Sequence, residues 1–222
     1  MITLMRKYLW PAFLVLSTVT FLFSGACGVL AEELEPIKLS APRLEKGKLL
    51  MEALSERQSS RSFSSEPLPI EVLSDLLWAA FGVNRPDSGR RTAPSARNWQ
   101  EIDIYVAMEK GLYLYDAGQN VLQPVLAQDI RAACGLQAFT QIAPVDLIFV
   151  ADLSKMSGDK TITDFYSATD TGFISQNVYL FCASEGLSTV VLGWVDRIRL
   201  AEVMGLKENQ KIVLTQPVGY AE

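Results

Sequence analysis

The sequence predicts a single α+β domain, and three features of the chain lead to that prediction. Two short apolar runs at 102–108 and 112–115 flank Glu109-Lys110-Gly111, a pattern typical of a β-hairpin. Segments with helical periodicity lie on both sides of this hairpin, and the one at 163–186 is long. Strands and helices therefore mix along one chain of 222 residues, which is long enough to bury a hydrophobic core.

The start of this domain is expected to be extended. Residues 32–47 carry several prolines and glutamates and are assigned to an extended leader, and the domain itself is assigned to 48–222. Around this boundary, within 44–56, leucines and Met51 are spaced among Lys and Glu residues. This spacing predicts a short amphipathic helix.

A second helix is expected over 69–81 and a long loop after it. Pro69 suits the first helical position, apolar residues recur at helical spacing, and Gly82 follows as a stop. Residues 83–100 lack periodicity and are rich in Pro, Gly, Asn and Arg. A polar loop of this length inside a compact domain is typically either functional or disordered.

Residues 163–186 form the longest helical candidate. Thr163, Asp164 or Ser167 is expected to cap its start, and Gly186 to end it. Apolar residues occur on more than one side, which is typical of a buried central helix. The other elements expected in this half are short, namely helical pieces at 128–133 and 136–142, strands at 145–150, 188–192 and 212–216, and a helix from Asp196 to Gly205.

Residues 1–31 differ in composition from the rest of the chain and predict a secretory signal peptide. Arg6 and Lys7 form a basic start, residues 9–23 are almost wholly apolar, and small residues lead to a cleavage site after Ala31. The expected location is therefore the bacterial periplasm. Two alternatives stay open: a lipoprotein signal that acylates Cys27, or a retained N-terminal membrane anchor. Contact with a membrane is expected only through this segment.

Composition and charge exclude several classes of function. The formal net charge is −5, whereas nucleic-acid binding needs a basic face. The chain has no histidine, which excludes Ser-His-Asp triads, Cys-His pairs and His-ligated metal sites, so no metal site is expected. Cys182 is expected in the core. A disulfide between Cys134 and Cys182 is compatible with export but does not follow from the sequence.

The segment Arg57-Gln58-Ser59-Ser60-Arg61-Ser62-Phe63 is a candidate site for a dianion such as a phosphate. Two guanidinium groups lie four residues apart with hydroxyl groups between them. Guanidinium forks match phosphate oxygens, and each hydroxyl adds a further contact. The segment follows the first expected helix, so it is expected at the helix end or in the turn after it. The alternative is a solvated, charged helix end.

Four blocks of the sequence, taken in order, resemble the FMN-dependent nitroreductase family. They are Arg57–Phe63, the Leu-Leu-Trp-Ala-Ala-Phe-Gly run within 73–84, the loop Pro94-Ser95-Ala96-Arg97-Asn98-Trp99-Gln100, and residues 170–193. The likeness spans 49–220 and more narrowly resembles the branch that includes the peptide thiazoline/oxazoline dehydrogenases. It implies a nitroreductase-like α+β fold with a mostly antiparallel central sheet flanked by helices and a long buried central helix.

The resemblance implies an FMN site between two subunits of an intertwined homodimer. Arg57, Ser59 and Arg61 would hold the phosphate or the ribityl chain. The family often has further basic residues after its last strand, whereas this chain ends with Ala221-Glu222. That contribution is therefore expected to be missing or to come from Arg90, Arg91 or Arg97.

The same resemblance assigns the groups around the flavin ring. Ser95 and Asn98 would reach the flavin from the loop, and the Val191-Leu192-Gly193 backbone would lie along the isoalloxazine ring with a main-chain N–H near N5. The alternatives are an ordinary turn at Asn98 and a strand-end turn at Gly193. Four neighbouring residues receive structural roles instead: the core for Trp78 and Phe81, and buried backbone groups or the dimer interface for Gln176 and Asn177.

The implied function is an FMN-dependent oxidoreductase with a ping-pong cycle through flavin N5. A small conjugated acceptor, such as a nitroaromatic or a quinone, would take the electrons. No acid–base residue of the protein is expected to be catalytic, because the flavin carries the redox chemistry. Export would separate the protein from cytosolic NAD(P)H, so the donor is open. The alternatives are an azoline-type dehydrogenase and an exported protein that binds flavin or another small molecule without turnover.

Overall fold

The computed structural model describes Glu33–Glu222, and the fold is given for these residues. The predicted signal peptide, its cleavage after Ala31 and the acylation of Cys27 fall outside them. Within 33–222, no helix combines the length and apolar character needed to cross a membrane. The segment before the first helix contains one short strand, β1 (Ile37–Lys38), which pairs with β6 at the edge of the sheet.

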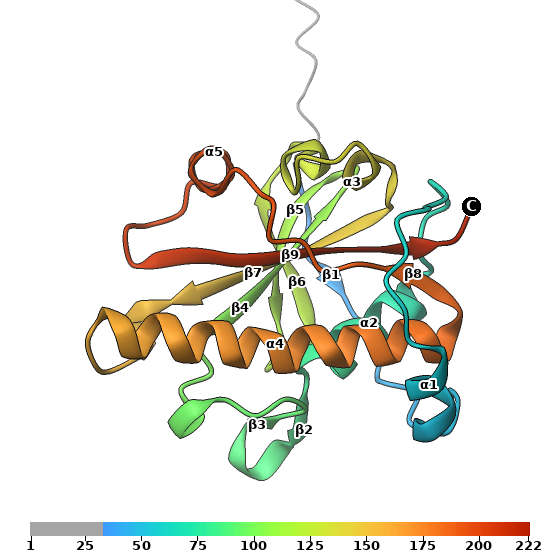
Figure 1. Cartoon of the computed structure of the whole chain (residues 1–222), viewed down its shortest axis with the longest axis horizontal. Helices are drawn as coiled ribbons and strands as arrows, with labels where there is room; N and C mark the ends of the chain where they lie inside the picture. The colour runs from blue at the N-terminus through green and yellow to red at the C-terminus, as the bar shows by residue number, and fades with distance from the viewer. Residues whose placement is uncertain (1–32) are drawn as a thin grey trace, which may run out of the picture. The chain divides into compact units, whose positions relative to one another are not determined.

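Seven strands form one antiparallel sheet (Figure 1), as the resemblance implied. Their order across the sheet is β1, β6, β5, β4, β7, β9, β8. The expected hairpin is confirmed, with Met108 of β4 opposite Gly111 of β5. Strand β6 was not predicted. The bounds after β1 are β4 Ile102–Met108, β5 Gly111–Asp116, β6 Val121–Leu126, β7 Val145–Asp152, β8 Leu187–Thr189 and β9 Gln210–Tyr220.

Helices cover both faces of the sheet (Figure 1). Successive side chains of a strand point to opposite faces, so Val106 and Ala107 enter different hydrophobic clusters. The cluster around Val106 includes residues of α2 and α4, and the cluster around Ala107 includes residues of α3 and α5. The helices are α1 Leu50–Glu56, α2 Ile70–Phe81, α3 Phe139–Ile142, α4 Lys160–Glu185 and α5 Arg197–Met204, with 3₁₀ turns at Arg131–Ala133 and Leu153–Lys155.

Two of the predicted helices have the ends that the sequence indicates. Pro69 directly precedes α2, and Gly82 directly follows it. The Asp196 side chain accepts a hydrogen bond from the backbone N–H of Arg199 (3.1 Å) and so caps α5. Gly205 ends α5 in the left-handed conformation, with φ of +65°, which glycine adopts without steric strain.

The long helix is confirmed, but it begins earlier than expected. Asp159 caps α4, because its side chain accepts a hydrogen bond from the N–H of Ile162 (3.0 Å); none of the three predicted caps is used. One side of α4 is buried against the sheet. Another side is apolar yet exposed, with Phe165 62% and Phe173 45% accessible. The apolar residues on a second side therefore do not pack within this chain.

Helix α1 is shorter than the range predicted for it. It starts at Leu50, and only Ala53 is buried. Leu49, Leu50 and Met51 are exposed, as is Leu54. The short helix is thus confirmed within the predicted range, with most of its apolar side chains exposed.

The expected loop at 83–100 contains a small hairpin of its own. Strands β2 (Val83–Arg85) and β3 (Arg90–Arg91) pair with each other across a 3₁₀ turn at Pro86–Ser88. A second 3₁₀ turn covers Ala96–Asn98. Strands of two or three residues are too short to give a recognisable period, so the sequence showed none.

Both cysteines of the described residues are buried free thiols. Cys182 belongs to the cluster on one face of the sheet and Cys134 to the cluster on the other, so the sheet separates them. Burial raises the pKa of both thiols. The core position expected for Cys182 is confirmed.

Candidate functional site

The segment after α1 runs along the end of the sheet. The N–H of Ser60 donates to the carbonyl of Thr189 (2.9 Å), and the Ser188 hydroxyl contacts the Ser60 hydroxyl at 3.1 Å. Phe63 is buried and anchors the segment in the core. These contacts hold residues 57–63 beside β8, close to the predicted backbone segment at 191–193.

Tyr179 of α4 joins two of the predicted groups. Its hydroxyl forms a hydrogen bond with the Ser59 hydroxyl (2.9 Å) and accepts another from the backbone N–H of Val191 (2.9 Å). The Arg57 guanidinium lies over the Tyr179 ring, with its carbon 5.3 Å from the ring centre. The sequence did not single out Tyr179, because a largely buried tyrosine in an apolar helix is most simply a core residue.

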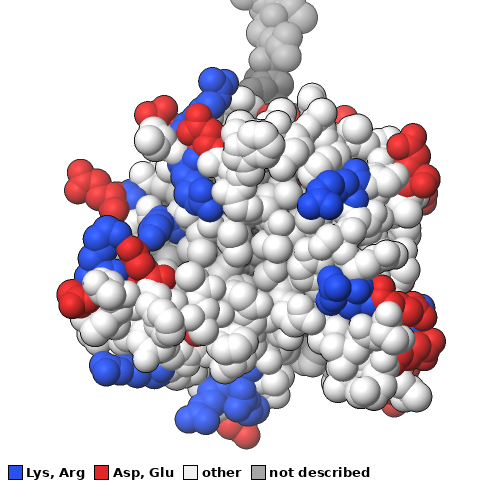
Figure 2. Space-filling model, in the orientation of Figure 1, with Lys and Arg blue, Asp and Glu red and all other residues white. Residues whose placement is uncertain are grey.

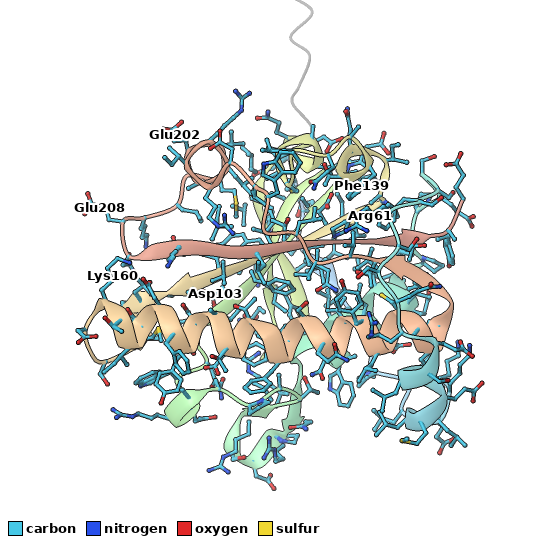
Figure 3. The ribbon with its side chains drawn as sticks, viewed as in Figure 1. Arg61, Asp103, Phe139, Lys160, Glu202 and Glu208 are labelled. Atoms are coloured by element: carbon cyan, nitrogen blue, oxygen red, sulfur yellow. The ribbon has the colours of Figure 1, made fainter. Side chains whose placement is uncertain are left out.

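The two arginines of this segment form no ion pair with a carboxylate of the described residues. Arg61 is exposed, and Figure 3 shows it beside the end of β9 where β8 pairs with it. On the face of the molecule that is turned to the viewer in Figure 1, Figure 2 shows basic side chains at separate points around a largely uncharged centre. A cavity of about 520 Å³ opens beside Arg57 and is lined also by Ser60, Tyr179 and Ser188. Of the two arginines, only Arg57 lines this cavity, and Glu56 lines it as well. A guanidinium group that pairs with no carboxylate, beside a polar cavity, suits an anion.

The backbone at 191–193 offers one free donor. Leu192 is fixed to β9, because its N–H donates to the carbonyl of Thr215 (2.8 Å) and its carbonyl accepts from the Thr215 N–H (3.2 Å). The N–H of Val191 is taken by Tyr179. The next residue, Gly193, is exposed, and its N–H has no partner within the described part of the chain. A Cβ placed there would meet only Leu214, at 3.8 Å, so the space beside Gly193 is open.

The predicted loop residues Ser95 and Asn98 lie in a backbone held in an uncommon conformation. Arg97, Asn98 and Gln100 all have positive φ, of 53°, 57° and 49°. Such conformations cost on the order of 1 kcal/mol or more for each residue and persist where surrounding contacts enforce them. Here the Ser95 hydroxyl accepts from the Gln100 N–H (3.0 Å), and the Gln100 side-chain amide donates to the Asn98 side-chain oxygen (3.2 Å).

A buried carboxylate ties this loop to α4. The N–H of Ala96 donates to Oδ2 of Asp170 (2.8 Å). Asp170 is 2% exposed, and Glu101, directly after the loop, is 0% exposed. Burial and the neighbouring Asp170 carboxylate raise the pKa of Glu101 to about 7.

The two groups of predicted residues are brought to different parts of the same helix. Arg57, Ser59 and Val191 meet at Tyr179, whereas the Ser95–Asn98 loop is anchored at Asp170. Nine residues of helix separate these two anchors, a rise of about 13 Å. Within one chain, the loop residues are therefore not gathered around Tyr179.

Two of the three arginines considered as substitutes for C-terminal basic residues, Arg91 and Arg97, have local partners. Arg91 donates to the carbonyl of Phe81 (3.0 Å) and to the Gln100 side-chain oxygen (3.0 Å), and burial lowers its pKa. Arg97 lies over the Trp99 ring, 5.4 Å from its centre. Arg91 therefore supports the loop, which argues against a role at a phosphate.

The predicted structural roles of neighbouring side chains are largely as expected. Phe81 is buried, while Trp78 is half-buried. The Asn177 side chain donates to the carbonyl of Ala80 (3.3 Å) and so satisfies a backbone group, whereas Gln176 is exposed. Among residues 33–222, no three acidic or cysteine side chains gather as metal ligands would.

Comparisons with known proteins find one recurring group of relatives. A model of the nitroreductase family matches residues 54–220. A curated protein of Methanocaldococcus jannaschii, provisionally named a nitroreductase, is 31% identical over 198 residues, covering 83% of this chain and 97% of that protein. A crystal structure of a provisionally named nitroreductase from Ralstonia eutropha is 44% identical, with a TM-score of 0.81, covering 84% of this chain and 90% of that one. The NADPH:FMN oxidoreductase from Vibrio harveyi, solved with NAD+, shares the fold at 20% identity and a TM-score of 0.60, covering 78% and 69%.

Proposed function

The chain belongs to the nitroreductase family and is an oxidoreductase, and we propose that FMN is its redox cofactor. When bound, FMN would supply the two-electron redox chemistry of the reaction. The observation that carries the proposal is a set of groups that lack partners within residues 33–222. Arg57, over the Tyr179 ring, and Arg61 pair with no carboxylate, and the N–H of Gly193 is free.

The residues at 57–61 fit the phosphate end of this cofactor. Arginine carries a fixed charge and a fork of donors that matches phosphate oxygens. Tyr179 holds the Ser59 hydroxyl and supports the Arg57 guanidinium, so neither group needs to reorganise when an anion binds. With Arg91 committed to the loop, Arg57 and Arg61 carry most of the charge that would face the phosphate.

The residues at 191–193 fit the ring end. The Gly193 N–H is a donor for the N5 region, and no side chain at Gly193 blocks the approach of a flat ring. Leu192, buried and fixed to β9, keeps this backbone rigid. A slot with apolar walls and few aimed polar groups is typical of cofactor sites.

We further propose that the protein works as a homodimer in which a second subunit brings its Ser95–Asn98 loop to the flavin. Within one chain the loop anchor lies about 13 Å along α4 from Tyr179. The exposed apolar residues of α4 and α1 support an interface, because contiguous exposed apolar surface typically marks an association site. A sedimentation measurement that finds only monomers at micromolar concentration would contradict the dimer.

The proposed acceptor is a conjugated small molecule such as a nitroaromatic or a quinone, which suits a flat slot over the flavin. An azoline-type dehydrogenase is the alternative enzyme, supported by the sequence motifs shared with that branch. An exported flavin-binding protein without turnover is the non-enzymatic alternative. Reduction of the bound flavin by dithionite but by neither NADH nor NADPH would favour a different donor or the binding protein.

Export to the periplasm is proposed from the composition of residues 1–31. Sequencing the N-terminus of the mature protein tests it. A start at Glu32 supports cleavage after Ala31, a lipid-modified Cys27 supports the lipoprotein alternative, and an intact Met1 supports the retained anchor.

The cofactor proposal is tested by the absorption spectrum of the purified protein. A yellow protein that releases FMN on denaturation, or a colourless one that takes up added FMN with micromolar or tighter affinity, supports the proposal. A protein that neither contains nor binds FMN would refute both enzymatic readings.

A further inference from the structure

We propose that Glu101 and Asp170 share one proton and that this buried carboxyl pair positions the Ser95–Asn98 loop. The two residues would act as positioning residues through Ala96, without contact to the cofactor. The link to catalysis rests on the proposed function, in which this loop meets the flavin. The existence of the pair and its contact with the loop rest on this chain's own residues and do not require a bound cofactor.

The geometry of the pair calls for a proton. Both carboxyl oxygens of Glu101 are buried, and neither finds a donor among the described residues. The Asp170 carboxyl group is the neighbouring acid, close enough to Glu101 for the two to share a proton. Two buried carboxylates in contact repel each other strongly, whereas one proton between them turns the contact into a hydrogen bond. Glu101 is the donor in this arrangement, because Asp170 already accepts from the backbone.

The pair connects the loop to two rigid elements. Oδ2 of Asp170, on α4, accepts the N–H of Ala96 at 2.8 Å. The carbonyl of Glu101 accepts the N–H of Asp152 at 2.9 Å, which fixes Glu101 to the end of β7. Helix and sheet thus hold the two carboxyl groups from opposite sides, and the loop is the part that can move.

The loop needs such an anchor. Two of its residues, Arg97 and Asn98, and Gln100 just after it have positive φ, so its backbone gains from relaxing whenever a contact is lost. Ala96 lies directly before two of these residues. Weakening the bond from Ala96 to Asp170 is therefore expected to release the conformation that orients Asn98.

The charges around the pair set the pH at which the proton leaves. Lys155 is the cation near Glu101 and lowers its pKa, but Lys155 also pairs with Asp103 at 2.7 Å. Figure 3 labels Asp103 on the strand that follows Glu101. Burial and Asp170 outweigh Lys155 and raise the pKa of Glu101 to about 7. Glu101 is therefore mostly protonated at pH 6 and mostly ionised at pH 8.

Exchange of the Ala96 amide hydrogen in the flavin-free protein tests the inference directly. Between pH 6 and 8 the fraction of Glu101 that carries its proton falls about tenfold. The protection of Ala96, corrected for the intrinsic rate, is expected to fall by up to the same factor in the wild type. Glu101→Gln supplies a permanent donor to Asp170, so its Ala96 protection should match the wild type at pH 6 and stay constant to pH 8.

Two further variants complete the test. Asp170→Ala removes the acceptor and should leave Ala96 poorly protected at every pH. Glu71→Gln, which removes an exposed carboxylate on α2, should behave as the wild type. A wild type whose Ala96 protection is independent of pH, or a Glu101→Gln protein that keeps the wild-type pH dependence, would overturn the proposal. If Asp170→Ala does not fold, the pH dependence of Ala96 protection in Glu101→Gln and in the wild type still tests the proposal.

A parallel titration with FMN separates this inference from the proposed function. The FMN affinity of the wild type should fall between pH 6 and 8, and that of Glu101→Gln should fall less. Absence of FMN binding at every pH, together with the expected Ala96 exchange, would refute the cofactor and leave the carboxyl pair supported. FMN binding without any effect of pH on Ala96 exchange would support the cofactor and refute the carboxyl pair.

Discussion

Helix α4 contacts the candidate site at two places, through Tyr179 toward its C-terminal end and through Asp170 near its middle. At Tyr179, a hydroxyl group joins the Ser59 hydroxyl to the N–H of Val191. At Asp170, a buried carboxylate receives the N–H of Ala96 beside the carboxyl group of Glu101. The first contact is made by hydroxyl and amide groups, whereas the second depends on the protonation of a carboxyl pair near neutral pH.

The two contacts also hold different kinds of backbone. The segment joined by Tyr179 has no residue with positive φ in 57–63 and is further supported by the backbone bond from Ser60 to Thr189. The loop joined by Asp170 contains two residues with positive φ, Arg97 and Asn98, and Gln100 follows it with a third. The part of the site with the more strained backbone is therefore held by the more pH-sensitive anchor. Five variants test this contrast.

The largest expected effect is on stability at the Asp170 end. The pKa of Glu101 is raised from 4.5 to about 7, so the folded protein binds this proton more tightly than the unfolded chain does. The contribution of Glu101 to the free energy of unfolding is greatest below pH 4.5, falls as pH rises to about 7 and is level above that. The loss amounts to about 3 kcal/mol.

Denaturation with urea at several pH values measures this loss. Asp146 is buried at the start of β7 and its pKa is raised in the same sense, so the wild type alone does not isolate Glu101. The difference in the free energy of unfolding between the wild type and Glu101→Gln isolates the contribution of Glu101. Equal slopes of stability against pH for the two proteins would contradict the assignment.

A smaller effect is expected at the Tyr179 end, on FMN affinity. Arg57→Ala or Arg61→Ala should each weaken binding by about 2 kcal/mol, the usual contribution of a charge-assisted hydrogen bond. In contrast with the carboxyl pair, this loss should be the same at pH 6 and pH 8. Fluorescence titration with FMN measures it, with Lys110→Ala in the β4–β5 turn as the charge-matched control. Unchanged affinity in both arginine variants would remove the phosphate role.

Tyr179→Phe tests whether the hydroxyl itself holds this end together. The variant loses two hydrogen bonds and leaves the N–H of Val191 without its partner. The expected loss in the free energy of unfolding is about 1 kcal/mol, because an unpaired buried donor is destabilising. Tyr166→Phe is the matched control, since Tyr166 also lies on α4 but is exposed. Equal stability of the two variants would show that the Tyr179 hydroxyl is dispensable.

The smallest stability change is expected at Gly193. An added Cβ meets only Leu214 at an ordinary contact distance, so Gly193→Ala should change the free energy of unfolding by less than about 0.5 kcal/mol. FMN affinity should nevertheless fall, because the methyl group enters the space proposed for the ring. Gly205→Ala gives the opposite pattern: its φ of +65° makes alanine strained by about 1 kcal/mol, with no effect expected on FMN. Full FMN affinity in Gly193→Ala would place the ring elsewhere.

The sequence alone predicted the ends of helices that stop at a glycine. Helices α2 and α5 end at glycines that the chain order reveals, and α4 ends at Gly186 for the same reason. Strand β6 was missed because it contains Pro124, a residue that disfavours a strand interior. The structure accommodates it because β1 pairs only with Val121 and Leu122, which leaves the edge beside Pro124 open.

The candidate site was predictable where it follows a family motif and unpredictable where it depends on tertiary contacts. Arg57, Ser59 and Gly193 were proposed from such motifs. Tyr179 was not, because its hydroxyl contacts a serine 120 positions away. Glu101 was also missed, since a glutamate between a polar loop and a strand is usually exposed. Only the packing of α4 over the loop brings it against Asp170.

Strand β9 has a consequence for the order of folding. It lies between β7 and β8, and β8 has no other strand neighbour. The bridge from Leu192 to Thr215 also requires β9, so the backbone around Gly193 takes shape only when the last strand of the chain has docked. A chain in which β9 has not docked therefore lacks the ordered backbone proposed to face the isoalloxazine ring.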